Sequence, residues 1–211
     1  EEGKIAQAIL SLSTFLLLEP STARAGSVVD YFNSLVSSKP ELKKKGITFS
    51  ESGDDYSDIE LIINNGIALG KKYKVQSKLS YPITKQTFLL LEKIKYDEND
   101  KGFWMQFYVP FWKKLYDEGM FEGYSYYMLI SSKNENLVSQ LEKNISKIKS
   151  FASWGGTAWW ELHNKKKVVV DGKEGEYQFR FYNNTTLETI GNKSSTNLYQ
   201  GTWEIYSDRN T

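Results

Sequence analysis

The feature that most constrains the fold of this 211-residue chain is a dense run of aromatic residues between positions 103 and 118. The large apolar side chains of this run recur in pairs separated by three and four positions: Phe103, Trp104, Phe107, Tyr108, Phe111, Trp112, Leu115 and Tyr116. This spacing predicts a helix with a broad apolar face, which must pack against another element. Pro110 predicts a kink or break near residue 109, because proline removes a backbone hydrogen bond.

The composition excludes several classes of chemistry. The chain has no cysteine and a single histidine, His163, so it cannot form a disulfide, a thiolate metal site or a multi-histidine metal site. Its 27 Lys and Arg residues nearly balance 26 Asp and Glu residues, and the net charge of +1 argues against a broad surface for nucleic acid or anionic membrane. No apolar run is long enough to cross a bilayer. We therefore expect no metal, no cofactor, no nucleic-acid partner and no transmembrane segment.

Residues 1–46 carry the pattern of a helix pair. Residues 5–18 are mostly apolar and end before Pro20, and residues 22–38 carry apolar side chains at helical spacing. The first of these segments has two readings from its residues: an amphipathic core helix, or the apolar stretch of a secretory signal with Ala23-Arg24-Ala25 as its cleavage site. The acidic start of the chain favours the core helix over the signal.

A third interpretation of the same segment rests on the spacing of Gly3, Ile5, Ala8, Leu12, Phe15 and Pro20. This spacing resembles the second helix of a tetratricopeptide (TPR) repeat, in which glycine permits a tight turn, alanine permits close packing of the paired helix and proline ends the helix. Ile5 stands where the family prefers an aromatic residue, and Phe15 stands where it prefers a small one. The resemblance implies that residues 1–46 are the end of a repeat array in a longer protein.

Residues 47–153 predict an α/β segment. Helices are expected at 58–69, 103–118 and 134–151, and strands at 71–79, 87–96 and 121–131. This order of elements is that of a ferredoxin-like unit. The stretch Trp112–Gly119 followed by Gly123-Tyr124 loosely resembles members of the dimeric α/β-barrel superfamily.

Residues 154–211 predict an antiparallel β-meander, because the apolar period changes to two after Gly155-Gly156. The expected strands are Thr157–His163, Lys167–Val170, Glu176–Tyr182, Thr185–Ile190 and Asn197–Tyr206. The C-terminal strands resemble the end of small lipocalin-like barrels of bacterial envelope proteins. The meander could share one sheet with residues 47–153, and the whole chain is predicted to have an α+β fold.

Two groups of aromatic residues are candidate binding sites. Tyr108, Trp112 and Tyr116 are expected on the rim of the aromatic helix, where they would border a groove or an interdomain seam. Trp159, Trp160 and Glu161 could stack on and bind a sugar, although neighbouring strand residues point to opposite faces. Core packing is the competing interpretation for both groups, and His163 is expected to be a surface or capping residue.

These observations favour a non-enzymatic binding or scaffold module of a bacterial TPR-type protein, with a protein as its partner. A small-molecule or glycan-binding module that uses the aromatic residues is the alternative. A hydrolase is less favoured, because no pattern pairs a nucleophile with a base. The high ratio of lysine to arginine suggests a bacterial origin, and both the cytoplasm and the envelope stay open as compartments.

Overall fold

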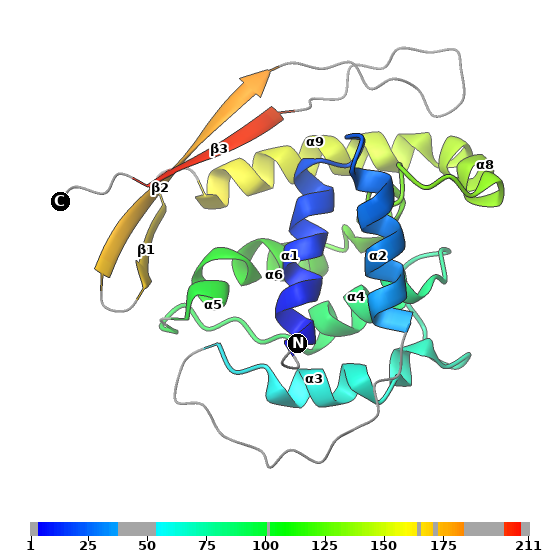
Figure 1. Cartoon of the computed structure of the whole chain (residues 1–211), viewed down its shortest axis with the longest axis horizontal. Coiled ribbons are helices and arrows are strands. Elements are labelled where there is room, and N and C mark those ends of the chain that lie inside the picture. Colours follow the sequence, from blue (N-terminus) through cyan, green and yellow to red (C-terminus); the bar gives the residue numbers. More distant parts are fainter. Residues whose placement is uncertain are drawn as a thin grey trace.

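The computed structural model describes residues 4–37, 54–100 and 102–163 in full, and the backbone of three strands between residues 166 and 207. Helices make up 69% of the fully described part, which contains no strand. Figure 1 shows these helices as one layered body with the strands at its upper left. The helices are α1 (Ile5–Leu18), α2 (Ala25–Ser37), α3 (Ser57–Asn64), the 3-10 turn η1 (Ile67–Leu69), α4 (Pro82–Lys93), α5 (Phe103–Phe107), α6 (Val109–Asp117), α7 (Phe121–Tyr127), α8 (Glu135–Lys143) and α9 (Ile145–His163).

The predicted α+β fold and its ferredoxin-like segment are therefore wrong. Residues 71–79 form turns and bends, residues 87–93 belong to α4, and residues 121–127 form α7. The runs 83–91 and 124–130 are buried throughout, because their helices are surrounded on all sides. A fully buried helix has no polar face, so a short stretch of it has the same apolar pattern as a buried strand.

The predicted β-meander from residue 154 is also wrong, because residues 157–163 are the last turns of α9. The Gly155-Gly156 pair does not end a helix here. A Cβ on Gly155 would lie 3.3 Å from Cζ of Phe151 and 3.6 Å from Cδ1 of Leu17, so this glycine allows α9 to approach α1 closely. The predicted strand 185–190 lies outside the described residues.

The described strands are β1 (Lys166–Val170), β2 (Lys173–Asn183) and β3 (Gly201–Ser207). They pair antiparallel in the order β1-β2-β3, with Lys166 opposite Tyr177 and Phe179 opposite Ile205. The sheet follows the helices in the chain and does not interrupt them.

Local sequence signals explain several helix boundaries. Pro82 occupies the first position of α4, where its missing N–H costs nothing. Pro110 occupies the second position of α6, and the aromatic run breaks between α5 and α6 at Tyr108, as predicted. The predicted helix 134–151 is instead divided at Asn144 into α8 and α9. Asn134 begins α8, since its side chain accepts a hydrogen bond from the Leu137 N–H.

The core connects α1 with the aromatic helices through hydrogen bonds that span the chain. The indole Nε1 of Trp112 donates to Oγ1 of Thr14 over 3.2 Å. The hydroxyls of Tyr124 and Tyr127 donate to the carbonyl oxygens of Ser13 and Leu17 over 3.2 and 3.1 Å. Each of these buried polar groups has a hydrogen-bond partner on the facing helix. The three bonds therefore fix the position of α6 and α7 against α1.

One of the two predicted domain boundaries lies outside the described residues, and the other lies inside a helix. The boundary at residue 47 lies among residues 38–53, outside the described part of the chain. The boundary at residue 154 lies inside α9. One hydrophobic cluster contains buried residues from every helix between α1 and α9, from Ala6 to Trp159.

Candidate functional site

The six residues predicted to bind a ligand do not form one site. Trp112 and Trp159 are buried in the core, with 0% and 1% of their surfaces exposed. Tyr108 and Tyr116 are half-buried, whereas Trp160 and Glu161 are exposed near the end of α9. A buried indole cannot serve as a stacking platform for a sugar, so packing accounts for Trp112 and Trp159.

The aromatic residues instead form a continuous network of rings through the helical body. The Trp112 ring centroid lies 5.0 Å from that of Phe111 and 4.9 Å from that of Tyr124, both in edge-on arrangements. Phe111 in turn lies 5.2 Å from Trp159. Edge-on contacts at these distances stabilise a core beyond the burial of area alone.

His163 is buried within this network and is not the surface residue that the sequence predicted. Its ring stacks on Trp159 at 3.7 Å. Nδ1 lies 2.8 Å from the carbonyl oxygen of Trp159, and Nε2 lies 2.7 Å from that of Phe107. Carbonyl oxygens only accept, so the ring satisfies both when each nitrogen carries a proton. The ring therefore bridges the last residue of α5 and the last turns of α9 through these two carbonyl oxygens.

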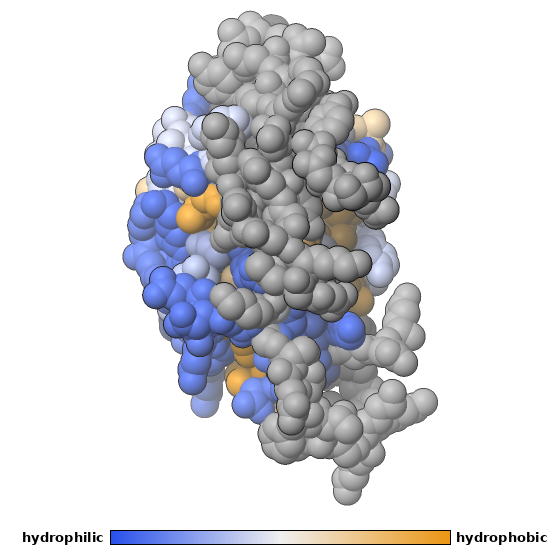
Figure 2. Space-filling view, turned by 90° about the vertical axis from the view of Figure 1, so that its left-hand side faces the viewer, coloured by the Kyte–Doolittle hydropathy of each residue, from blue (hydrophilic) through white to orange (hydrophobic). Residues whose placement is uncertain are grey.

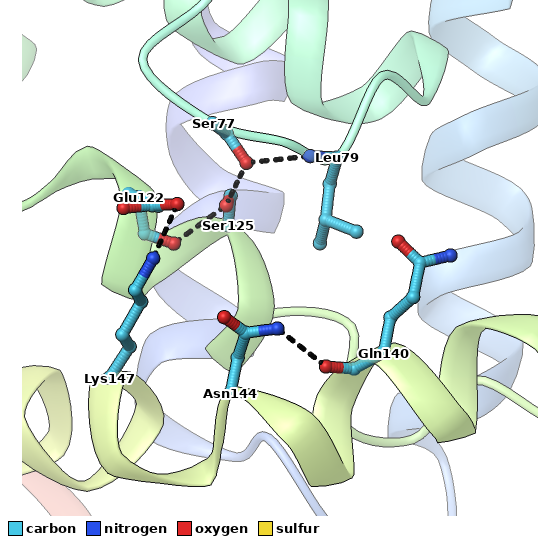
Figure 3. A network of polar contacts seen from close by, with 7 residues as sticks. All are labelled: Ser77, Leu79, Glu122, Ser125, Gln140, Asn144 and Lys147. Carbon is cyan, nitrogen blue, oxygen red and sulfur yellow. Dashed lines mark hydrogen bonds and ion pairs between the residues drawn. The ribbon is translucent and has the colours of Figure 1, made fainter.

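A polar network fastens the loop before α4 to α7 (Figure 3). The Leu79 N–H donates to Oγ of Ser77 over 3.0 Å, and Ser77 lies 2.6 Å from Oγ of Ser125. The Ser125 hydroxyl donates to the carbonyl oxygen of Glu122 over 2.7 Å, so the Ser77 hydroxyl is the donor to Ser125. The hydroxyl protons of Ser77 and Ser125 thus both have an acceptor.

Lys147 lies beside this network, and a lysine next to a serine can act as the base that activates a serine nucleophile. Its Nζ lies 2.7 Å from Oε1 of Glu122, and this hydrogen bond raises the pKa of Lys147. An ammonium held in its charged form is a poor base, and the buried Ser125 hydroxyl already donates to backbone. The arrangement is suited to holding the loop and not to nucleophilic catalysis.

Among the carboxyl groups of the described helices, Glu60 has the pKa that departs furthest from its ordinary value. Burial, together with a smaller contribution from nearby Asp55, raises its pKa to about 7. A hydrogen bond from the Ala6 backbone and the charge of Lys4 act in the opposite direction. The carboxyl thus connects α3 with the first turn of α1.

The outer side of α1 is the feature that the sequence did not reveal. The residues that face the core are buried: Ala6, Ile9, Leu10, Ser13, Thr14, Leu16 and Leu17. Leu18 is half-buried, and so are four further apolar residues along one side of the helix, of which all but Ala8 also pack against the core cluster: Ile5, Ala8, Leu12 and Phe15. We call these four residues the outer stripe of α1. The helix is therefore apolar around most of its circumference, and only one side lies in the core.

The remaining described surface offers little that resembles a ligand site. Among the fully described residues, no group of His, Asp and Glu could hold a metal ion. No helix in the same part of the chain is long and apolar enough to span a membrane. The described atoms on the side shown in Figure 2 are mostly hydrophilic, with small apolar areas between them.

Comparisons with known proteins add no assignment. No protein-family model, curated protein or solved structure matches this chain. The resemblances to TPR repeats, ferredoxin-like units and lipocalin-like strands thus rest on sequence patterns alone, and the helical fold removes the second of them.

Proposed function

We propose that this chain is a non-enzymatic, helical protein-binding module, and that the outer stripe of α1 receives an amphipathic helix of a protein partner. The observation that carries the proposal is the distribution of burial around α1. A helix that is apolar on all sides normally lies inside a larger assembly. Here one side of α1 packs in the core, whereas the outer stripe is half-buried.

The spacing of the outer stripe suits a helix as its occupant. Ile5, Ala8, Leu12 and Phe15 follow one another at intervals of three, four and three residues, which is the a/d pattern of helix pairs. At 3.6 residues per turn, they cover an arc of about 80°. Ala8 lies in the middle, and a small side chain there permits close approach of a second helix.

Charged groups mark one end of the stripe. The guanidinium of Arg24 lies 5.2 Å from the centroid of the Phe15 ring. Arg24 also donates to both carboxylate oxygens of Glu19, over 2.7 to 3.0 Å. A docked helix would therefore meet an apolar surface along α1 and a polar rim at its C-terminal end, which is the usual anatomy of a protein interface.

The resemblance to a TPR repeat supports the same surface. In that pattern Ala8 is the position of close helix packing, and the outer stripe contains four of the six matching residues. In the structure, Ala8 is half-buried, and the fully buried alanine of the first turn is Ala6. The half-buried positions of the pattern, Ile5, Ala8, Leu12 and Phe15, thus keep part of their surface for contact with a further helix.

The test is selection of amphipathic helical peptides from a displayed library, with the whole chain as bait. We expect selected peptides to carry apolar residues at intervals of three and four. Ala8→Arg should weaken their binding by at least about tenfold, which corresponds to ~1.4 kcal/mol. The control is Ser34→Arg, which adds the same charge on the exposed side of α2.

Thermal unfolding of each variant separates lost binding from lost folding. If Ala8→Arg lowers the midpoint, Ala8→Gln replaces it in the binding measurement. Failure to select any helical peptide, or equal binding by the Ala8 and Ser34 variants, would rule out the outer stripe as the docking surface.

A further inference from the structure

We propose that the loop of residues 70–80, which we call the lysine loop, together with Ile67, is a docking surface for the anionic headgroups of a membrane. The loop follows η1 and leads into α4, at the periphery of the helical body in Figure 1. This proposal concerns a different surface from the outer stripe of α1 and does not depend on it.

The charges of the lysine loop carry the first step of the argument. Lys71, Lys72, Lys74 and Lys78 are all exposed, and residues 70–80 contain no acidic side chain. The ion pairs among the described residues involve other cations, such as Lys93, Lys113 and Lys147. Four positive charges therefore gather on eight consecutive residues without an ion-pair partner in the described part of the chain.

Nearby carboxylates are already engaged. Glu92 accepts a hydrogen bond of 2.8 Å from the hydroxyl of Tyr73, and its other carboxylate oxygen lies 3.6 Å from Nζ of Lys93. Glu122, beside the far end of the loop, pairs with Lys147. Each of these carboxylates thus pairs with a cation outside the loop, so neither of them neutralises the lysines of the loop.

The loop is held in place from its inner side. Tyr73, Val75 and Ser77 are half-buried and Leu79 is buried, so over residues 72–79 they alternate with exposed residues, which are lysines except at position 76. Ser77 contacts Ser125 of α7, as Figure 3 shows. Nζ of Lys85 donates to the carbonyl oxygen of Gly70 over 3.2 Å. Because the inner side chains fix the loop, little further ordering is needed when it binds.

An exposed apolar residue stands directly before the lysines. Ile67 has 56% of its surface exposed, although it is a large aliphatic residue. The Gly70 N–H donates to the carbonyl oxygen of Ile67, and the Tyr73 N–H donates to that of Gly70. These two tight turns place Ile67 next to the first lysines. Lysines beside an exposed aliphatic side chain are the composition of segments that lie in a membrane interface.

Magnitudes favour a membrane over an acidic peptide. A single exposed ion pair with a peptide contributes little, because water screens it. An anionic leaflet attracts every lysine near it at once, and each strengthens binding by about fivefold. The overall charge of +1 does not oppose this attraction, since charges further than about 10 Å from the surface are screened. Nucleic acid is less suitable, because the loop has no arginine for bidentate contacts to phosphate.

Co-sedimentation with lipid vesicles tests the proposal on the whole chain. One vesicle contains equal amounts of phosphatidylcholine and phosphatidylserine, and the other contains phosphatidylcholine alone. We expect binding to the first only, and weaker binding as salt is added. Changing all four lysines of the loop to glutamine should weaken binding by about several hundredfold, from the fivefold effect of each. Ile67→Ser should weaken it by about tenfold or more.

The matched control changes four other exposed lysines to glutamine, which alters the net charge equally: Lys95, Lys133, Lys143 and Lys149. This variant should retain most of the binding. Equal losses in the two quadruple variants would show a general charge effect and overturn the proposal. Absence of binding to anionic vesicles would also overturn the proposal. The same holds if the unchanged chain binds only polyglutamate or RNA and the loop variant loses that binding.

Discussion

At the residue scale, a buried histidine and a half-buried glutamate hold helices together through backbone groups. His163 faces the carbonyl oxygens of Phe107 and Trp159 and so connects α5 with α9. Glu60 interacts with the backbone of Ala6 at the start of α1. Glu60 acts on the first turn of α1 and His163 on the last residue of α5, where backbone groups lack a partner within the helix. The protonation of Glu60 therefore affects how α3 is joined to α1.

The pKa of Glu60 predicts a pH dependence of stability. Burial raises this pKa from its ordinary value of 4.5 to about 7, so the folded state binds the proton more tightly than the unfolded state. The contribution of Glu60 is fully present below pH 4.5, and it is lost as the pH rises to 7. We expect Glu60→Gln to raise the denaturation midpoint at pH 8 relative to the unchanged chain, and to have little effect at pH 4.5.

The control for this prediction is Glu142→Gln on the exposed side of α8, which changes the net charge equally. Urea denaturation at both pH values gives the comparison. If the two variants respond to pH in the same way, the buried position of Glu60 is not the cause.

At the scale of elements, two glycines at the helices α7 and α9 have opposite surroundings. A Cβ on Gly123 of α7 would lie 2.8 Å from Cβ of Phe151 and 3.1 Å from the carbonyl oxygen of Lys147, both in α9. A Cβ on Gly156 would meet no atom within 4 Å. One glycine is thus required by helix contact, whereas the other occupies an open position inside a helix.

This difference predicts opposite effects of the same substitution. Gly123→Ala should lower the free energy of unfolding by about 1–3 kcal/mol, because α7 and α9 must separate to admit the methyl group. Gly156→Ala should raise it by up to about 1 kcal/mol, since alanine is the better helix former. Chemical denaturation monitored by circular dichroism measures both. A loss for Gly156→Ala, or no loss for Gly123→Ala, would contradict the described contact between these helices.

At the scale of the whole molecule, the helices share one core. Buried residues from α1 to α9 belong to a single hydrophobic cluster, and hydrogen bonds join Trp112 to Thr14 and Tyr124 to Ser13 across it. A core of this kind unfolds as a unit, because loss of one helix exposes its neighbours. The predicted division of the chain at residue 47 would instead separate α1 and α2 from the rest.

A shared core predicts a single cooperative transition for the helical body. Ala6→Leu overfills a completely buried site in α1, and His163→Phe removes the hydrogen bonds at the end of α9. Each should lower the free energy of unfolding by about 1–3 kcal/mol and shift the same transition. Calorimetry shows whether this is so. Two transitions, each sensitive to only one of the variants, would support separate domains.

The sequence by itself determined the helix at residues 5–18, the break in the aromatic run at Pro110 and the exclusion of cysteine chemistry. These features depend on local backbone rules or on composition, which neighbours in space do not alter. The sequence predicts strands at residues 87–96 and 121–131, because a short apolar run is the same in a buried helix and a buried strand. Only the burial of runs 83–91 and 124–130 among other helices distinguished the two.

For the candidate sites too, the sequence gives the residue types, whereas only the structure gives their burial. The sequence identified the aromatic side chains and the lysines, but it could not show that Trp112 and Trp159 are enclosed while Ile67 is exposed. The neighbouring Asn164 and lysine run predict a surface position for His163. The sequence could not show that the carbonyl oxygen of the distant Phe107 meets its ring. Burial depends on which segments meet in space, and for this chain only the tertiary packing decided it.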